Sequence, residues 1–452
     1  MNRRNFLAVT SAGTAGSFLF PNILVAKESA TLNVACIGVG GRGDHLLSNV
    51  LANDVNVVAL ADVDLNRSSK ARKKLDGIPF YQDFRDMLSK QIKEIDAVVV
   101  ATPDHTHHYI VKSCMKEGLP VYVEKPMTHS IHEARDLMQM EKETGLACQM
   151  GNQGHSSYGP FLAKEIMRAG IAGEISEVHA WTTHKVFAPF NALAEAKAVP
   201  ETLDWDTWQG PVSGVAYSDA YLPGKWRKWN RFGGGALGDM GCHCMDVPYH
   251  ALDLTYPDKI IPEFTEPRYK ESFPGSVKIT YRFPGNSQRG PVTLTWYHGT
   301  EFKPPRPEAL AEKDDLGGQH GGSYMVGSKE TVTAGGTGTP ISFIPSVRRK
   351  ELAPQLKALM SKNNVQAREN DAHYQTYVGD HMKNWLDAVR GNVTANSNFA
   401  YAGRLTQVAL LGNVAVAVND TLKIDPETGD ILDNPEAVKL AQGPEPRKGW
   451  EC

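Results

Sequence analysis

The feature that most constrains the fold is a repeating order of apolar strands and amphipathic helices that begins near residue 31. The segment "TLNVACIGVGGRGDHLL" has the pattern of a buried strand, a tight turn and a helix, and "VNVVALADVD" follows as a second strand. Two more apolar runs, "IDAVVVATPDHTHH" and "LPVYVEKP", alternate with helical segments. This alternation predicts an α/β fold with a doubly wound parallel sheet of the Rossmann type over residues 31–150.

The pattern changes after residue 150. "ISEVHAWTTH", "VKITYRF" and "PVTLTWYH" are longer strands with one polar face, which is typical of antiparallel sheets. Residues 151–452 are therefore predicted to form an α+β domain with a large, mainly antiparallel open sheet. The Pro- and Gly-rich stretch 302–322 predicts a surface loop, and we expect the C-terminal helices to pack back on the first domain.

The first 26 residues have the pattern of an export signal. Arg3 and Arg4 stand directly before a short apolar stretch, which is too short and too rich in small polar residues to anchor in a bilayer. The Arg-Arg-Asn-Phe-Leu run resembles a twin-arginine signal, with cleavage near Ala26. The sequence predicts a periplasmic mature protein without a membrane span; a frayed basic terminus is the alternative.

Composition excludes several classes of partner. The net charge is −3 and charged residues make up 22% of the 452 residues, so no basic excess points to nucleic acid or anionic lipid. The six cysteines follow no disulfide or metal-binding spacing. We expect mostly free, packed thiols.

A dinucleotide site is predicted at the first turn. Gly38, Gly40, Gly41, Arg42 and Gly43 form a G-x-G-x-x-G pattern between a strand and a helix, where backbone N–H groups can approach a pyrophosphate. One further predicted contact is Asp62, which ends the second strand and is placed to accept from a ribose hydroxyl. Its charge favours NAD, while Arg67 nearby leaves NADP open.

Other candidate cofactor contacts follow strands of the same sheet. A loop at the carboxyl end of a parallel strand faces the ligand crevice. The candidates there are Thr102, Pro103, His107, Glu124, Lys125 and Asn152. Lys125 is of particular interest because an ammonium beside the reacting carbon can stabilise an alkoxide or pass a proton; the alternative is a solvated lysine at a strand end.

The stretch "GDMGCHCMD", residues 238–246, is predicted to be helical. At about 100° per residue, Asp239, His243, Asp246 and His250 would share a face within roughly 60° of arc. Cys242 and Cys244 would point about 200° apart, so a metal site is not expected. A histidine with a carboxylate one turn earlier suits proton transfer instead.

These motifs together resemble the glucose–fructose oxidoreductase, inositol dehydrogenase and MocA (Gfo/Idh/MocA) family. The resemblance rests on the glycine pattern, Asp62, Glu124-Lys125-Pro126 and "FGGGALGDMGCH", and it covers nearly the whole mature chain. It implies that His243 is the general acid/base, that Asp239 orients it or binds substrate, and that Lys125 is the cation beside the reacting oxygen. It also implies a homo-oligomer built through the open sheet.

Substrate contacts are predicted just upstream of the 238–246 stretch and after the last strand of the first domain. Aromatic rings and cations can stack on a sugar and bind its hydroxyls. The candidates are Gln153, Trp226, Arg227, Trp229 and Arg231, together with Asp239 and His243.

Three functions fit these features. The first is an NAD(P)-dependent oxidoreductase acting on a sugar, polyol or sugar derivative, with a tightly held cofactor because an exported enzyme cannot draw on the cytoplasmic NAD pool. The second is a redox-neutral, NAD-dependent glycosidase that oxidises, eliminates, hydrates and reduces. The third is a non-catalytic sugar-binding protein with the same fold.

Overall fold

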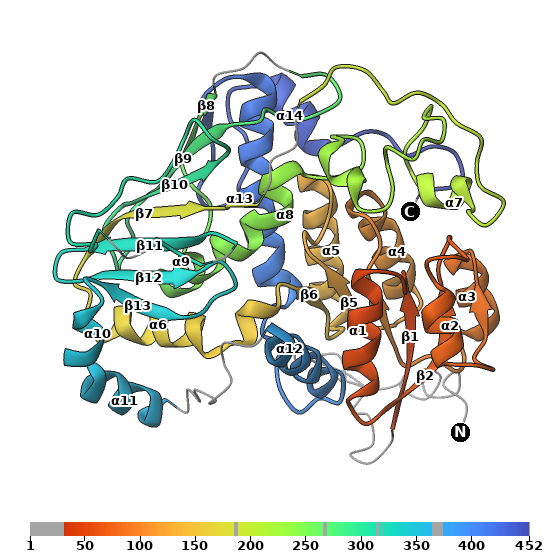
Figure 1. The fold of residues 1–452 in the computed structure, drawn as a ribbon, viewed down its shortest axis with the longest axis horizontal. Helices are drawn as coiled ribbons and strands as arrows, with labels where there is room; N and C mark the ends of the chain where they lie inside the picture. Colours follow the sequence, from red (N-terminus) through yellow and green to blue (C-terminus); the bar gives the residue numbers. More distant parts are fainter. Residues whose placement is uncertain are drawn as a thin grey trace, which may run out of the picture.

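The computed structural model describes residues 31–184, 189–264, 269–312, 316–318, 320–363 and 374–451. The predicted signal, residues 1–26, lies outside the described residues. The described chain forms two sheets, one on each side of a central group of helices (Figure 1).

The first sheet is parallel, and its strand order β3-β2-β1-β4-β5-β6 is that of a Rossmann fold. Its strands are β1 (Leu32–Ile37), β2 (Val55–Ala61), β3 (Phe80–Tyr81), β4 (Ala97–Val100), β5 (Val121–Glu124) and β6 (Gln149–Gly151). Its helices are α1 (Arg42–Leu51), α2 (Ser69–Lys74), α3 (Phe84–Gln91), α4 (Asp104–Lys116) and α5 (Ile131–Thr144). The predicted doubly wound parallel sheet is confirmed.

Strand register brings the predicted site loops to one edge of this sheet. Helices cover both of its faces, and all residues of β4 and β5 are buried. Ile37 pairs with Val100, and Glu124 pairs with Gly151. The loops that begin after these four residues therefore emerge next to one another at the carboxyl edge.

The second sheet has eight strands in the order β13-β12-β11-β7-β10-β9-β8-β14. The strands are β7 (Ile175–Trp181), β8 (Lys259–Phe264), β9 (Val277–Phe283), β10 (Val292–His298), β11 (Gly322–Gly327), β12 (Thr331–Gly335), β13 (Ile341–Ile344) and β14 (Leu422–Lys423). Neighbouring strands are antiparallel except β7 and β10. The prediction of a mainly antiparallel sheet is confirmed.

The second sheet alternates as its sequence predicts. In β9, Val277, Ile279, Tyr281 and Phe283 are buried, and Arg282 between the last two is exposed. Burying one face of each strand supplies most of the favourable free energy of this layer, since each large apolar side chain contributes about 1.5–3 kcal/mol. The helices of the second domain cover that buried face (Figure 1).

The helices that follow the first sheet are α6 (Tyr158–Arg168), α7 (Trp205–Gln209), α8 (Gly235–Cys244), α9 (Asp246–Ala251), α10 (Val347–Glu351), α11 (Ala353–Lys362), α12 (Tyr374–Val389), α13 (Phe399–Val418) and α14 (Pro435–Gln442). Long helix α13 packs against both α5 of the first domain and α8 of the second. Within the described residues, no helix combines the length and apolar character needed to cross a membrane.

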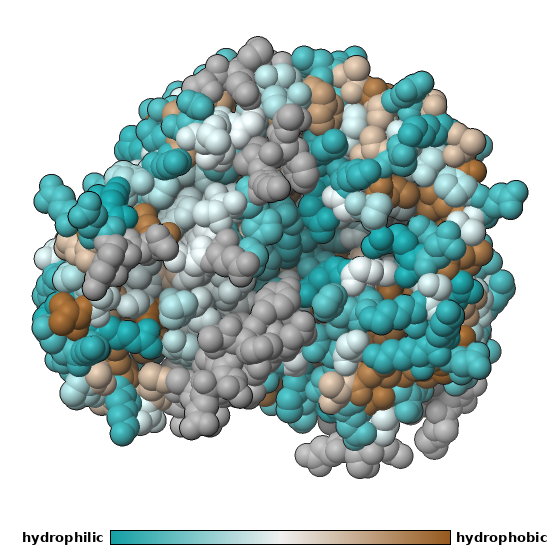
Figure 2. Space-filling model, in the orientation of Figure 1, coloured by the Kyte–Doolittle hydropathy of each residue, from teal (hydrophilic) through white to brown (hydrophobic). Residues whose placement is uncertain are grey.

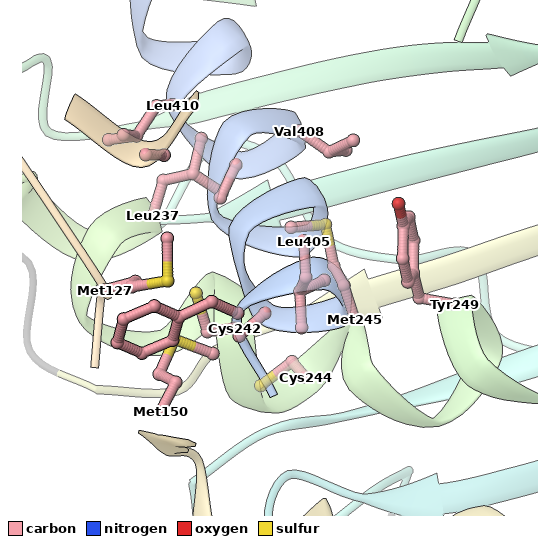
Figure 3. Packing of buried hydrophobic residues seen from close by; sticks show 14 of the residues in the cluster. Met127, Met150, Leu237, Cys242, Cys244, Met245, Tyr249, Leu405, Val408 and Leu410 are labelled. Carbon is pink, nitrogen blue, oxygen red and sulfur yellow. The ribbon is translucent and has the colours of Figure 1, made fainter. Parts of the chain in front are cut away.

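Packing on α13 fixes which face of α8 is free. Leu237 and Cys242 of α8 lie against Leu405 and Val408 of α13 in the same buried cluster (Figure 3). The apolar face of α8 is therefore buried against α13, and its polar residues face the first domain.

Two helix boundaries differ from the sequence prediction. Residues 104–108 were expected in a polar loop, but α4 begins at Asp104, because Pro103 supplies an extended residue before the helix and Asp104 suits its positive end. The 238–250 segment is not one continuous helix: α8 ends at Cys244 and α9 starts at Asp246. The predicted single face shared by Asp239, His243, Asp246 and His250 is therefore wrong.

Candidate active site

A cavity of about 450 Å³ lies between the carboxyl edge of the first sheet and α8. The surface is hollowed between the two domains, where hydrophilic side chains gather (Figure 2). The predicted site residues on the cavity wall are Gly38, Gly40, Arg42, Asp62, Thr102, Pro103, Glu124, Lys125, Gln153, Trp226, Arg227, Asp239 and His243.

The glycine turn at one end has the geometry of an anion site. Gly41 has a φ of +57° and precedes α1, so the N–H groups of the first turn of α1 point toward the cavity side. A Cβ at Gly43 would stand 1.7 Å from the carbonyl oxygen of Gly38, so only glycine permits this approach of helix and strand. The residues present fit a dinucleotide pyrophosphate.

Asp62 and Arg67 shape the part of the cavity beside that turn. The carboxylate of Asp62 accepts hydrogen bonds from the N–H groups of Val39 at 2.9 Å and Gly40 at 3.0 Å, so it fixes the turn as well as facing the cavity. A Cβ at Gly41 would lie 2.6 Å from a guanidinium nitrogen of Arg67. Two carboxylates, Asp62 and Asp64, line this end with one arginine, which suits a ribose with free hydroxyls.

A chain of polar side chains links the glycine turn to the end of β5, where Lys125 follows. The Nε of Arg42 lies 2.7 Å from a carboxylate oxygen of Glu124, and the amide of Gln153 donates to that same oxygen at 3.3 Å. Arg42 begins α1, Glu124 ends β5, and Gln153 follows β6. The Glu-Lys-Pro segment is thereby tied to the dinucleotide turn.

Lys125 is held by Asp239. Its Nζ donates to the Asp239 carbonyl oxygen at 2.6 Å and to the Asp239 carboxylate at 2.7 Å. Arg227 approaches the same carboxylate oxygen at 3.2 Å, and its guanidinium lies 4.3 Å from the centre of the Trp226 ring. Burial opposes ionisation of Asp239, but Lys125 and Arg227 outweigh it and lower its pKa below the usual value.

His243 stands one turn after Asp239 on α8 and lines the same cavity. Burial, and after it the ammonium of Lys125, lowers the pKa of His243 well below the usual value. The imidazole is consequently neutral at pH 7 and has a free lone pair for a proton. The neighbourhood thus combines a fixed cation with a neutral base.

Asp104 is a wall residue that the sequence reasoning missed. It begins α4, is buried, and accepts from the N–H of Gly234 at 3.2 Å. Burial raises its pKa to about 7 although Arg227 and Lys125 oppose this. Its place directly after Pro103, in a loop that had been singled out, was the available signal.

Two histidines complete the mouth of the cavity. His184 follows β7 and His320 precedes β11; both are exposed, both line the cavity, and their ring nitrogens are 2.9 Å apart. Partial desolvation of the imidazole lowers the pKa of His184; Asp239 opposes this, and His320, Lys125 and Arg227 add to it. The two residues are 136 positions apart, and no local pattern in the sequence joins them.

Six predicted site residues are not on the cavity wall: Gly41, Gly43, His107, Asn152, Trp229 and Arg231. The ring nitrogens of His107 each lie 2.8 Å from a backbone carbonyl, of Thr102 and of Pro126, so His107 braces the Lys125 segment from behind. The cause is the early start of α4, which turns this residue into the core.

The other displaced side chains have partners of their own. The Asn152 amide donates to the buried carboxylate of Asp246 at 3.0 Å. Trp229 is buried, and Arg231 forms a two-point ion pair with Glu271, with contacts of 2.5 and 2.9 Å. Asp246 itself belongs to α9 and faces this inner network, not the cavity.

The cysteines in the last turn of α8 are structural. Cys242 and Cys244 are buried free thiols, and burial raises the pKa of each to about 12. Within the described residues no three His, Cys, Asp or Glu side chains are arranged to hold a metal ion.

The fold and the glycine turn define a dinucleotide-binding protein with a two-domain architecture. Residues 32–152 match the oxidoreductase family with an NAD-binding Rossmann fold, Gfo/Idh/MocA, and residues 163–284 match the C-terminal α/β domain of that family. The chain belongs to this family.

Named relatives match part of the chain. An inositol 2-dehydrogenase from Rubrobacter xylanophilus is 30% identical over 149 residues, which are 32% of this chain and 42% of that protein. A glycosyl hydrolase family 109 protein from Solibacter usitatus is 28% identical over 170 residues, 35% of this chain and 38% of that protein. Each match thus spans less than half of the relative.

A solved structure extends the likeness in fold to almost the whole chain. The WlbA dehydrogenase from Bordetella pertussis, in complex with NADH and UDP-GlcNAcA, superimposes with a TM-score of 0.60 at 14% identity. The match covers 87% of this chain and 98% of that one. At this identity it establishes the shared fold alone.

Proposed function

We propose that this protein oxidises and reduces a sugar, polyol or sugar derivative with a tightly held nicotinamide cofactor. The observation that carries the proposal is that Lys125, Asp239 and His243 line the same cavity as the glycine turn. The inositol dehydrogenase among the relatives supports a polyhydroxylated substrate.

The side chains divide the work of the reaction. NAD, held by the glycine turn and Asp62, would supply the acceptor for the hydride that leaves the substrate carbon. His243 takes the proton from the substrate hydroxyl while the carbon that bears this hydroxyl loses a hydride, so the C–OH group becomes a carbonyl. The Lys125 ammonium stabilises the developing alkoxide, and Asp239 fixes the direction of that ammonium.

The substrate end is suited to hydroxyl groups. Trp226 lines the wall with the Arg227 guanidinium over its ring, and Arg227, His184 and His320 offer N–H donors on the same wall. NAD is the favoured cofactor because Asp62 and Asp64 would repel a 2′-phosphate; NADP stays open through Arg67.

A second candidate function is the redox-neutral glycosidase. Oxidation at one carbon acidifies the neighbouring C–H, elimination expels the glycosidic group, water adds, and the hydride returns. The glycosyl hydrolase family 109 relatives favour this reading. The third possibility is a sugar-binding protein that does no chemistry.

One experiment separates the three. Purified protein loaded with NADH is mixed with ketoses, and protein loaded with NAD with polyols and aryl glycosides, while the near-ultraviolet absorbance of NADH is followed. A change in absorbance with net conversion supports the oxidoreductase. Glycoside cleavage without net redox supports the glycosidase. No change in either test, with the cofactor bound, supports the binding protein.

The location and assembly of the protein are also proposals. The twin-arginine pattern supports export to the periplasm with the cofactor already bound, and the open sheet supports a homo-oligomer. Cell fractionation with and without an Arg3→Lys, Arg4→Lys signal, and light scattering of the purified protein, test the two separately.

A further inference from the structure

The cavity wall also carries six mainly apolar residues, and we call this part of the wall the aromatic chamber: Phe84, Ile110, Leu203, Thr207, Trp208 and Trp450. Phe84 and Ile110 belong to the first domain, and the other four come from the second. Segments that lie outside the first domain in sequence therefore complete the wall of the chamber.

The α7 segment is tied directly to the end of β2. Leu203 forms a β-bridge with Asp64, the N–H of Asp204 donates to the Val63 carbonyl at 2.9 Å, and the N–H of Leu65 donates to Thr202 at 2.9 Å. The loop that carries Asp62 and Asp64 is thus paired with a segment of the second domain, residues 202–210, which we call the strap.

Stacked rings give the strap its own rigidity. Asp204 caps α7 by accepting from the N–H of Thr207 at 3.0 Å. The rings of Trp205 and Trp208 stack at 4.8 Å with an interplanar angle of 13°, and the Trp208 carbonyl lies 3.0 Å from a ring nitrogen of the buried His105 on α4. The strap is fixed to both β2 and α4.

The C-terminal tail holds the strap from outside. Arg447 forms an ion pair of 2.6 Å with Asp206 and donates to the Asp206 carbonyl at 2.6 Å. Trp450 is buried, with the guanidinium of Arg85 4.7 Å from its ring centre and the Phe84 ring at 6.0 Å. Figure 1 shows the C-terminus beside α7.

We infer that the strap and the tail form an adenine pocket, so that a bound dinucleotide leaves only when both move. Leu203 of the chamber is paired with Asp64, and Phe84 follows β3, which lies beyond β2 at the opposite end of the sheet from β5 and Lys125, so of the dinucleotide the adenine suits this position. Flat apolar rings bind a nucleobase by stacking. This inference rests on the proposed function, since it takes NAD as the ligand.

Retention is the functional consequence. A cofactor that exchanges more slowly than substrates turn over must be oxidised and reduced in place. The enclosure therefore assigns the protein to cycles that return the hydride to a second carbohydrate or to the same one.

The test measures release of NADH, independent of turnover. The full-length mature protein is loaded with NADH, an excess of NAD is added, and loss of the bound-NADH fluorescence gives the dissociation rate. Arg447→Ala and Trp450→Ala are each expected to raise this rate at least tenfold, and Trp450→Phe much less because it keeps an aromatic ring. Thermal melting establishes that each variant is folded.

The matched control is Arg135→Ala. Arg135 also joins the C-terminal region to the first domain, through an ion pair with Asp430 at 2.5 Å, but it is not on the cavity wall. Its loss is expected to leave the release rate unchanged.

Two fragments of the cofactor locate the effect. Trp450→Ala should weaken binding of ADP-ribose at least tenfold and leave binding of nicotinamide mononucleotide unchanged. Folded Arg447→Ala and Trp450→Ala proteins that release NADH at the wild-type rate would overturn the inference while the proposed function stands. Failure of the wild-type protein to bind NADH would overturn both.

Discussion

Asp104 allows the charge balance of the site to be tested through stability. Its carboxyl is buried at the start of α4 and accepts from the N–H of Gly234. Burial raises its pKa from 3.8 to about 7 in the folded protein. Replacing Asp104 with Asn keeps an acceptor for Gly234 and removes the ionisation.

The pH dependence of this contribution to the free energy of unfolding follows from the difference in the pKa of Asp104 between the folded and unfolded states. Between about pH 4 and pH 7 the folded protein holds a proton that the unfolded chain has lost, so this group's stabilisation is complete below pH 4 and is lost as the pH rises through about 7. A difference of about three pKa units corresponds to about 4 kcal/mol in full, of which about 3 kcal/mol falls between pH 5 and pH 8.

The assay compares Asp104→Asn with wild type by scanning calorimetry at these two pH values. With the usual unfolding entropy per residue, about 3 kcal/mol shifts the melting temperature of a chain of this length by about 3 °C. The variant is expected to gain this much relative to wild type on going to the higher pH. Titrating groups that do not interact with Asp104 cancel in the difference.

Asp430 supplies the control. The Arg135 guanidinium, and after it the Thr428 hydroxyl, lower the pKa of Asp430, so its stabilisation is present above the unfolded pKa and lost only in acid. Because arginine stays charged throughout, the cost of Asp430→Asn should be the same at both pH values. An Asp104→Asn difference that also stays constant, or that shrinks as the pH rises, refutes the reasoning about the buried carboxyl.

Three further predictions concern the proposed base, His243, and the buried network around Asp246. His243→Asn should lower kcat/KM by about 100- to 10,000-fold, the usual range for general acid–base catalysis, with NADH affinity unchanged in a fluorescence titration; a loss below tenfold would exclude this role. Because burial and then Lys125 lower the pKa of His243, wild-type kcat/KM for oxidation should hold between about pH 7.5 and pH 6, and a tenfold fall in steady-state rates there would contradict a neutral base. Asp246→Ala leaves three buried donors without an acceptor, on Asn152, His155 and Tyr401, and should lower the free energy of unfolding by about 3 kcal/mol or more in urea titrations; a cost below about 1 kcal/mol would show that the network carries no stability.

The features that the sequence predicted well are those set by local pattern. The parallel sheet follows from buried apolar runs such as β4, and the first turn follows from glycines at positions where a larger residue would not fit. Lys125 stands at a strand end, and Asp239 and His243 are one helical turn apart, so each could be placed without knowing the rest of the chain. Their meeting on one cavity wall then depends only on the order of the strands and the position of α8.

What the sequence could not supply depends on contacts between distant segments. His107 seemed a cofactor contact because its loop follows a strand, but α4 starts at Asp104 and directs it inward. The arc that included Asp246 assumed an unbroken helix through Met245. His184 with His320, and Trp450 with the ribose end of the cavity, are brought together by tertiary packing that no local spacing encodes.

The proposed adenine pocket implies that the two ends of the cavity exchange ligands at different rates. At one end His184 and His320 are exposed, so small polar molecules can reach Lys125 and His243 from solvent. At the other, a buried Trp450 and a strap paired with the loop after β2 stand between the chamber and solvent. A dehydrogenase that used free NAD would be slowed by such a roof, because every turnover would have to break the strap and tail contacts. A catalyst that carries the hydride from one carbohydrate to the next breaks those contacts once, when the cofactor first binds, and its substrates then exchange through the other end of the cavity.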